Sequence, residues 1–293
     1  MNTPTPDQVI SDAEFVRFRD YFYQKTGIHF AESKRYFVDK RIVSRMEATG
    51  HKTFRTWFTF MRFDMSGEEL SRLTELMTVN ETYFFRESYQ FDCLVNSALT
   101  ELHEARPRGR TLRILSLPCS TGEEPYSIAL YLLEYWPHIH ARDVEIHGAD
   151  IDGKVLAKAQ EGIYSKSSIR LLPPELLETY FRPRPAGGMQ VVEDVRACVS
   201  FAKVNVINRQ DMGRYRGFDV IFCRNLLIYF DDVMRRQAAA ALYDALNPGG
   251  FVFLGHSESM SRISSMYTPR RFPDALVYQK STASGGRHAN PDC

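Results

Sequence analysis

The chain has 293 residues, 44% of them hydrophobic, and its 37 basic and 36 acidic side chains leave a net charge of +1. This length and apolar fraction exclude a disordered chain and allow one large α/β domain with a smaller companion. The balanced charge gives no general attraction to nucleic acid or to an anionic membrane, so electrostatic recognition must be local.

The spacing of the cysteines and histidines indicates whether disulfides or a metal site are to be expected. The five cysteines are scattered without a C-x-x-C pair, and the eight histidines form neither H-x-x-x-H nor H-E-x-x-H. Neither a disulfide framework nor a metal site is therefore expected. No apolar run reaches the ~18 residues of a membrane span, and residues 1–15 lack the features of a signal peptide. We expect a reduced, cytoplasmic protein that does not insert into the membrane.

Residues 1–85 are predicted to form a helical N-terminal domain with its linker. Ser11 and Glu14 have the spacing of a capping box, and Phe15, Phe18 and Phe22 follow at helical intervals. Further helices are predicted at 32–48, 54–63 and 68–77. No strand pattern is present in this part of the sequence, so a small helical bundle is expected.

After a polar stretch at 103–111, the pattern changes to alternating strands and helices. Strands are predicted at 112–117, 144–149, 218–223 and 251–255, and helices at 126–136, 152–161 and 231–246. This alternation predicts a doubly wound parallel sheet within a domain at 86–280. Residues 180–206 interrupt the rhythm and are predicted to form a small inserted antiparallel β element. The polar tail at 281–293 is predicted to be disordered.

The loop after the first predicted strand is acidic. It contains one glycine, Gly122, followed by Glu123 and Glu124, where a G-x-G-x-x-G loop would favour a pyrophosphate. Two carboxylates at a helix N-terminus suit a cofactor with a cationic end, such as the ammonium and sulfonium of S-adenosylmethionine. The alternative is that both acids only complement the helix dipole.

Two later features lie beside predicted strands. Asp150 ends the second strand, where an acid accepts hydrogen bonds from ribose hydroxyls in NAD and S-adenosylmethionine sites. Acids also cap helices, and Asp152 is the better candidate for that role. The turn at 247–250, Asn-Pro-Gly-Gly, precedes the last predicted strand, which is common among class I methyltransferases but is otherwise an ordinary tight turn.

Five segments together resemble the CheR family of chemotaxis receptor methyltransferases. They are VNETYFFRES (79–88), CSTGEEPYSIA (119–129), ADID (149–152), FCRNLLIYFD (222–231) and GHSES (255–259). The resemblance implies a helical bundle followed by a Rossmann-like class I methyltransferase domain with a small inserted antiparallel β element. It also implies methyl transfer from S-adenosylmethionine to receptor glutamates in chemotaxis adaptation, with S-adenosylhomocysteine as product.

The resemblance implies a set of site residues. Arg86 and Tyr229 match the residues that face the substrate, although Tyr229 alone would more often be a core aromatic. The matches to cofactor-contacting positions are Asn80, Thr82, Arg86, Glu124, Asp150, Asn205, Val206, Arg224 and Asn225. For Asn205, the alternative is a strand-end hydrogen bond. A glutamate with its reference pKa of about 4.3 is already ionised at neutral pH, so the chemistry needs neither a general base nor a metal.

The resemblance also concerns partners. Lys34, Arg41 and Arg45 lie along one stripe of the helix predicted at 32–48 and are expected to dock the acidic receptor helices, unless they form only a solvated basic face. Enterobacterial members tether themselves to a receptor C-terminal pentapeptide by strand addition. Here Pro183 and Pro185 cannot donate to an added strand, which predicts an enzyme without this tether.

Other classes of protein are less consistent with the sequence. A nicotinamide dehydrogenase would need the missing G-x-G-x-x-G loop. A receptor-binding module without activity would have little reason to keep Arg86, Glu124, Asp150 and Tyr229 together. A nucleic-acid methyltransferase would be expected to carry a basic face or an N/D-P-P-Y/F motif, and neither is visible. A monomer that binds receptors and no nucleic acid is expected.

Overall fold

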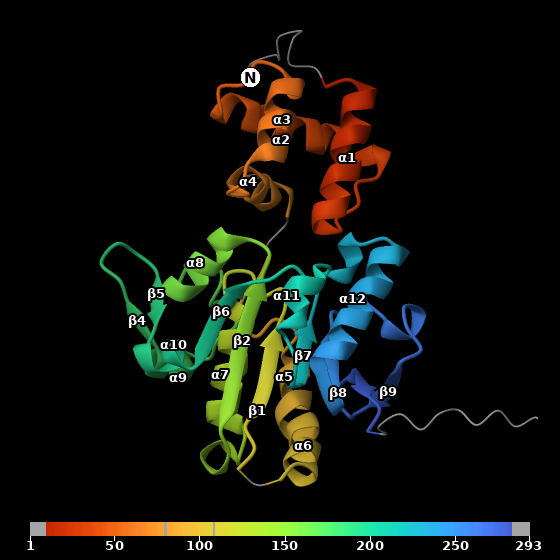
Figure 1. Ribbon diagram of the computed structural model, residues 1–293. Helices are drawn as coiled ribbons and strands as arrows, with labels where there is room; N and C mark the ends of the chain where they lie inside the picture. The colour runs from red at the N-terminus through yellow and green to blue at the C-terminus, as the bar shows by residue number, and fades with distance from the viewer. Residues whose placement is uncertain (1–9, 79–80, 108, 283–293) are drawn as a thin grey trace, which may run out of the picture.

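The computed structural model describes residues 10–78, 81–107 and 109–282. A helical bundle lies above an α/β domain in Figure 1. The bundle comprises α1 (Asp12–Thr26), α2 (Arg35–Ala48), α3 (Phe54–Phe63) and α4 (Glu68–Met77), with a 3-10 turn η2 (Glu32–Lys34) before α2. The helices predicted at 54–63 and 68–77 are confirmed, and the one predicted from residue 32 starts as that 3-10 turn.

The start of α1 has the predicted capping box. The Ser11 backbone N–H donates to Glu14 Oε2 at 2.9 Å, and the Glu14 N–H donates back to Ser11 Oγ at 3.3 Å. These bonds satisfy two of the N–H groups that a helix start leaves unpaired. At the other end, Gly27 adopts a left-handed conformation with φ 77° and stops the helix.

A seven-stranded sheet forms the centre of the α/β domain, in the order β6-β2-β1-β7-β8-β10-β9. The strands are β1 (Leu112–Ser116), β2 (Val144–Asp150), β6 (Val199–Lys203), β7 (Phe218–Cys223), β8 (Leu246–Leu254), β9 (Tyr267–Arg271) and β10 (Leu276–Lys280). The pairs from β6 to β8 are parallel, and β10 and β9 continue the sheet antiparallel. The predicted parallel sheet is confirmed, with this antiparallel edge added.

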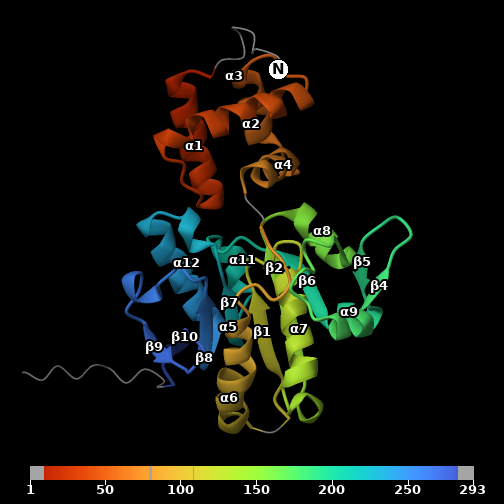
Figure 2. The same ribbon diagram turned by 180° about the vertical axis from the view of Figure 1, so that it is seen from behind.

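Both faces of the sheet are buried, because helices cover each of them, and successive side chains of a strand point to opposite faces. Leu115, Ile221 and Val252 pack with α12 (Asp232–Ala245), in a core that continues into the helical bundle. Ile114, Val220 and Phe251 face the opposite core. Figure 2 shows this second face covered by α5 (Ser88–Cys93), α6 (Leu99–Ala105) and α7 (Glu123–Tyr135).

Shorter elements connect these parts. The remaining helices are η3 (Leu94–Ala98), η4 (Ile139–Ala141), α8 (Gly153–Glu161), α9 (Pro174–Tyr180), α10 (Glu193–Ala197), α11 (Arg209–Gly213), η5 (Leu227–Tyr229) and η6 (Met260–Arg262). Strand β8 includes the Pro-Gly-Gly sequence, so the turn predicted at 247–250 is wrong: these residues form the irregular start of a strand, with a register shift against β7. None of the described helices is long and apolar enough to cross a bilayer.

The inserted β element differs from the prediction for 180–206. A separate sheet has the order β3-β5-β4, from β3 (Ile163–Tyr164), β4 (Phe181–Pro183) and β5 (Met189–Val191). Residues 199–203 are not part of it, because β6 pairs parallel to β2 at the edge of the main sheet. The third strand of the insert comes instead from β3, after α8. The tail predicted to be disordered lies outside the described residues from 283 onward.

Candidate functional site

Two adjoining pockets lie at the carboxyl ends of the strands, beneath the helical bundle. They have volumes of about 540 and 620 Å³ and share Pro118, Asp150 and Asn225. The first is lined further by Glu81, Thr82, Tyr83, Arg86, Phe91, Cys119, Ser120, Glu124 and Arg224. The second is lined further by Thr26, Ile28, Thr78, Leu117, Ile151, Val204, Asn205, Val206, Leu226, Tyr229 and Phe230. This edge of a doubly wound sheet is where such folds bind ligands.

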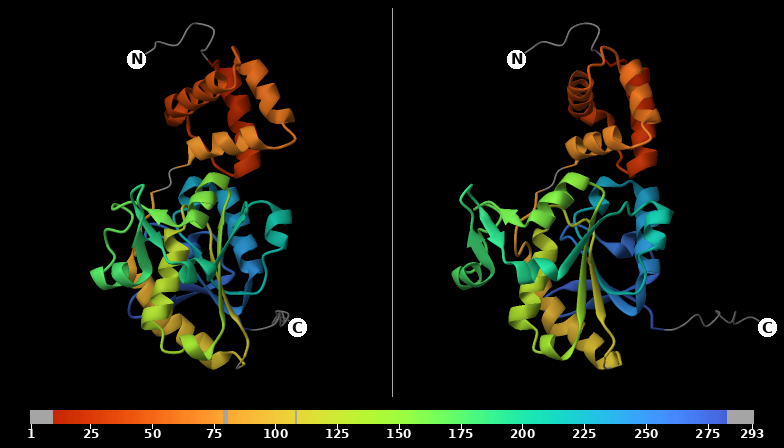
Figure 3. Two further views of the ribbon diagram at one scale, coloured as in Figure 1. Left: turned by 90° about the vertical axis from the view of Figure 1, so that its left-hand side faces the viewer. Right: turned by 60° about the vertical axis from the view of Figure 1, so that its left-hand side comes forward.

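The helical bundle contacts this edge through the end of α1. Ile28 forms an antiparallel bridge with Phe230, and the His29 N–H donates to the Tyr229 carbonyl at 3.3 Å. A Cβ on Gly27 would lie 3.1 Å from the Phe230 ring, so glycine permits this close approach. Figure 3 shows the bundle over the upper edge of the sheet in both views. The chain after α1 therefore fixes the bundle to the loop that carries Tyr229.

Asp150 ends β2 and lines both pockets. Its Oδ2 accepts the Ser120 N–H at 2.9 Å and its Oδ1 accepts the Asp152 N–H at 3.0 Å. Only 4% of Asp150 is exposed, and burial raises the pKa of its carboxyl to about 6. Each oxygen keeps acceptor capacity for a ligand hydroxyl. As predicted, Asp152 caps the next helix, accepting the N–H groups of Lys154 and Val155.

This raised pKa predicts how ligand binding depends on pH. A ligand whose hydroxyls donate to Asp150 prefers the ionised carboxylate, so its affinity should rise as pH increases to about 6 and then level off. Below that pH, affinity should fall by up to about tenfold per unit. Titrations with S-adenosylhomocysteine from pH 5 to pH 8 measure this. Asp150→Asn should bind more weakly at pH 8 and lose the dependence; an unchanged pH profile in this variant would exclude Asp150 as its source.

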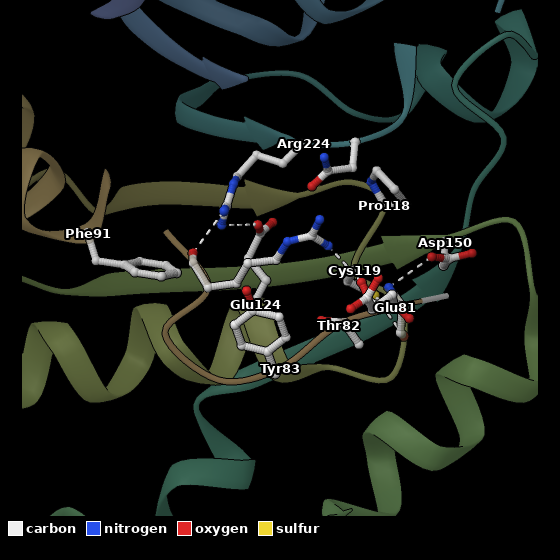
Figure 4. A pocket seen from close by; sticks show the side chains of 12 residues that line it. Glu81, Thr82, Tyr83, Phe91, Pro118, Cys119, Glu124, Asp150 and Arg224 are labelled. Carbon is white, nitrogen blue, oxygen red and sulfur yellow. Dashed lines mark hydrogen bonds and ion pairs between the residues drawn. The ribbon is translucent and has the colours of Figure 1, made fainter. Parts of the chain in front are cut away.

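At the other end of the first pocket, Arg224 joins two acids. Figure 4 shows Arg224 and Glu124 facing each other, well away from Asp150. Arg224 Nη1 lies 2.9 Å from Glu124 Oε2, and Nη2 lies 3.1 Å from Glu87 Oε2 and 2.8 Å from the Arg86 carbonyl oxygen. Burial raises the pKa of Glu124, and the Arg224 charge opposes the rise. These contacts tie the segment after the bundle to the loops after β1 and β7.

The two residues matched to the substrate position also lie at this site. Arg86 lines the first pocket and donates from Nη1 to the Glu81 carbonyl at 2.7 Å. Tyr229 lines the second, and burial raises the pKa of its hydroxyl while the Arg86 charge lowers it. The hydroxyl is therefore neutral and able to donate at physiological pH.

Backbone strain is concentrated around the first pocket. The non-glycine residues with positive φ in the described chain are Phe85, Glu87, Ser120 and Asn225, at 60°, 58°, 49° and 58°. Ser120 and Asn225 line the pocket, and the other two flank Arg86. Strained backbone of this kind clusters at ligand sites. In addition, Ser120 Oγ is buried without a hydrogen-bond partner among the described residues, as expected for a group that a ligand completes.

The other predicted cofactor positions have varied surroundings. Thr82 lines the first pocket, and Asn205 and Val206 line the second. The Asn205 side chain also makes local bonds: Nδ2 donates to the Lys25 carbonyl at 2.8 Å, and Oδ1 accepts the Ile207 N–H at 3.2 Å. Asn205 therefore also makes the local hydrogen bonds at a strand end that were the alternative to a cofactor contact. Asn80 lies outside the described residues.

The predicted docking stripe is partly turned inward. Arg45 forms a two-pronged contact with Glu69, at 3.1 and 2.6 Å, and Glu69 is only 4% exposed. Arg41 donates from Nε to the Leu76 carbonyl at 2.5 Å, and its guanidinium lies 3.3 Å from the centre of the Phe37 ring. Lys34 is exposed in the turn before α2. Of the three, only Lys34 is therefore free of such contacts.

Several site residues were not predicted from the sequence. Thr26, Ile28 and Thr78 line the second pocket from the helical bundle, and Tyr83 lines the first. No strand end or motif marks the three bundle residues, so only the packing of the two domains reveals them. Tyr83 lies inside the segment 79–88, where the resemblance pointed to its neighbours. Glu123 does not line either pocket; its carboxylate accepts from the Thr121 hydroxyl.

The site has the features that S-adenosylmethionine requires. Asp150 lies where the pockets meet, suited to ribose hydroxyls, and Glu124 lies at the far end of the first pocket, suited to the ammonium group of the amino acid end. Among the residues that the structure describes, no group of three or more histidine, cysteine or acidic side chains is arranged to hold a metal ion.

Comparison with known proteins agrees with this geometry. Residues 80–274 match the family model "CheR methyltransferase, SAM binding domain", and residues 13–78 match "CheR methyltransferase, all-alpha domain". The chain is 53% identical to chemotaxis protein methyltransferase 2 of Vibrio cholerae, over 93% of this chain and 94% of the relative.

More distant relatives align over a similar span. The chain is 34% identical to the chemotaxis protein methyltransferase of Salmonella typhimurium, over 89% of this chain and 88% of the relative. The corresponding Escherichia coli protein is also 34% identical, over 89% of each chain. The predicted family and fold class are confirmed and the dehydrogenase alternative is excluded: this chain belongs to the CheR family of chemotaxis methyltransferases and is an S-adenosylmethionine-dependent methyltransferase.

Proposed function

We propose that this protein transfers a methyl group from S-adenosylmethionine to glutamate side chains of bacterial chemoreceptors, forming methyl esters. The observation that carries the proposal is the meeting of Arg86, Tyr229, Glu124 and Asp150 at two adjoining pockets between the domains. Such an arrangement can hold a cationic cofactor and an anionic acceptor next to each other.

In this proposal the cofactor extends across both pockets. Val206 and Ile28 in the second pocket would hold its adenosine, and Asp150 would accept hydrogen bonds from its ribose hydroxyls. Glu124 and Ser120 in the first pocket would hold its amino acid end. The carboxylate of Glu124 in the first pocket and the apolar Val206 and Ile28 in the second support this direction.

The residues around the acceptor orient it rather than activate it. When bound, the cofactor supplies an electrophilic methyl group on its sulfonium. The acceptor glutamate is already ionised, with a reference pKa of about 4.3, so no proton has to be removed. Arg86 holds the carboxylate through its planar guanidinium, and the Tyr229 hydroxyl donates to one oxygen while the other attacks. The gain in rate comes from alignment and from exclusion of water.

A methylation assay with purified receptor tests the proposal. Wild-type protein should bind S-adenosylmethionine without added metal and form alkali-labile methyl esters on the receptor. Replacing the modified receptor glutamates by glutamine should abolish the signal. Tighter binding of NAD than of S-adenosylmethionine would contradict the cofactor assignment, and methylation that survives removal of the glutamates would contradict the acceptor.

We further propose that receptors dock through the helical bundle, in part through Lys34, whose exposed charge suits an acidic helix. Lys34→Glu should raise the KM for receptor by about two- to fivefold, the range for an exposed ion pair, and leave S-adenosylhomocysteine binding unchanged. The effect should shrink as salt increases. Lys52→Glu, an equal charge change at another exposed position of the bundle, is the matched control. If both variants raised the KM for receptor equally, the effect would come from the net charge of the bundle and not from a docking contact at Lys34.

The absence of a pentapeptide tether is a second proposal about the receptor. Strand β4, at one edge of the inserted sheet, has only three residues, and its last, Pro183, has no N–H to donate. The hairpin closes tightly, since the Arg184 N–H donates to the Gly188 carbonyl at 3.0 Å. Receptors with and without a C-terminal Asn-Trp-Glu-Thr-Phe sequence should therefore be methylated with equal kcat/KM. A clear binding isotherm for the free pentapeptide would contradict this.

A further inference from the structure

The carboxylate of Glu258, in the segment GHSES, joins the ends of two neighbouring strands beside the site. Its Oε2 accepts the N–H groups of Asn225 and Gly255, both at 2.8 Å, and its Oε1 accepts the Leu227 N–H at 2.8 Å. Gly255 directly follows β8, and the other two donors belong to the loop after β7. The Glu258 side chain thus pairs three backbone N–H groups that are not paired within a strand or helix at this point of the chain.

The loop held by Glu258 carries the groups that the site uses. Arg224 at its start binds Glu124, Asn225 lines both pockets, and Tyr229 lines the second. Asn225 has a left-handed backbone, with φ 58°. Asparagine tolerates this conformation better than most non-glycine residues, and a contact to its backbone can hold it there. The hydrogen bond from the Asn225 N–H to Glu258 is such a contact.

Gly255 leaves the space that this contact needs. A Cβ at this position would lie 2.9 Å from Glu258 Oε2 and 3.0 Å from the Asn225 nitrogen. Both distances are too short for a side chain, so the carboxylate or the loop would have to move. Gly255 and Glu258 therefore act together: the Glu258 carboxylate is the hydrogen-bond acceptor, and the missing side chain of Gly255 leaves room for it.

We propose that Glu258 is a positioning residue for methyl transfer: it holds the loop from Arg224 to Phe230 in the shape that directs Asn225 toward the cofactor and Tyr229 toward the acceptor. This inference rests on the proposed roles of Asn225 and Tyr229. A carboxylate is suited to the task because it offers two acceptor oxygens to the N–H donors. An amide of equal size offers one acceptor oxygen and turns an NH2 group against a remaining donor.

Two variants test the contact from both sides. Glu258→Gln and Gly255→Ala should each weaken S-adenosylhomocysteine binding, and each should lower kcat by about ten- to a hundredfold, the effect of a small misplacement of reacting groups. The KM for receptor should stay near the wild-type value. Ser259→Ala is the control, because its hydroxyl faces the Tyr278 hydroxyl at 3.3 Å rather than the loop. Rates are expressed per folded enzyme, so a loss of stability alone does not count as support.

A double-mutant cycle separates positioning from general support of the fold. If Glu258 acts through Tyr229, Glu258→Gln should lower kcat much less in a Tyr229→Phe background than in the wild type. Fully multiplicative effects, or unchanged kcat and S-adenosylhomocysteine affinity in Glu258→Gln, would overturn the inference. A failure of the proposed function would give another result, because the wild type would bind S-adenosylhomocysteine without methylating receptors. The S-adenosylhomocysteine affinity of Glu258→Gln would then still test whether Glu258 positions Asn225.

Discussion

An Arg86→Ala variant is expected to fold normally and to lose at least about a hundredfold in kcat/KM for receptor methylation. Each hydrogen bond to an ionised group contributes about 1.5–3 kcal/mol, and a guanidinium can offer a carboxylate two. A loss of about 2.7 kcal/mol corresponds to the hundredfold effect. Folding should be little affected, since the side chain donates one hydrogen bond, to the Glu81 carbonyl, at a half-buried position.

Initial rates of methyl ester formation at varied receptor concentration measure this loss. Arg86→Lys is the informative companion, because it keeps the charge and loses the planar fork, so its activity should be intermediate. Tyr229→Phe removes one hydroxyl, and its effect should appear in kcat more than in S-adenosylhomocysteine affinity. Full activity of Arg86→Ala would mean that Arg86 does not hold the acceptor.

Replacing Arg224 by methionine is expected to destabilise the protein strongly. The Arg224 side chain is 3% exposed, and its removal leaves the carboxylates of Glu87 and Glu124, 18% and 12% exposed, without their cation. Breaking a buried ion pair from one side costs about 3–5 kcal/mol. For a protein of this size the thermal midpoint should fall by on the order of 10 °C.

The sign of the pH dependence gives an independent check. Burial raises the pKa of Glu124 above its ordinary value of 4.5, and loss of Arg224 raises it further. A carboxyl with a raised folded pKa stabilises the fold fully below its ordinary pKa and loses that contribution as pH rises through the folded pKa. The destabilisation in Arg224→Met should therefore be smaller at pH 5 than at pH 8.

A surface pair provides the control for Arg224. Arg113 contacts Glu145 at 2.9 Å, with side chains 34% and 53% exposed, and such pairs are worth about 0–1 kcal/mol. Arg113→Met should therefore shift the midpoint far less than Arg224→Met. Adding Glu87→Gln to Arg224→Met should restore part of the stability. Equal shifts in the two single variants would show that the Arg224 network adds nothing beyond an ordinary ion pair.

Local signals predicted most of the fold. The capping box at Ser11 and the cap at Asp152 depend on residues within three or four positions, so a reading of adjacent sequence suffices. Strand β7 is an apolar run buried at every position, and β1 is buried at all but one, so both could be recognised from the adjacent sequence. Asp150 and Glu124 could be placed in the site because strand ends in such sheets meet at one edge.

Pairing between distant segments was not predictable in the same way. Residues 199–203 mix apolar and polar side chains, which fits an antiparallel insert as well as the edge of a parallel sheet; only their pairing with β2 decides. Arg45 illustrates the same limit. Its helical position suggested a solvent-facing stripe, but Glu69, on another helix, draws it inward and also accepts from the Trp57 ring N–H at 2.7 Å.

The shared wall of the second pocket links the two domains thermodynamically. Thr26, Ile28 and Thr78 of the helical bundle line the same cavity as Asp150 and Val206 of the α/β domain. A ligand in that cavity favours the arrangement in which both walls are in place. A macromolecule that binds the bundle and shifts that arrangement also changes the affinity of the ligand. By reciprocity, the ligand changes the affinity of that macromolecule by the same factor. One coupling free energy then describes both how receptor binding changes the affinity for cofactor and how cofactor binding changes the affinity for receptor.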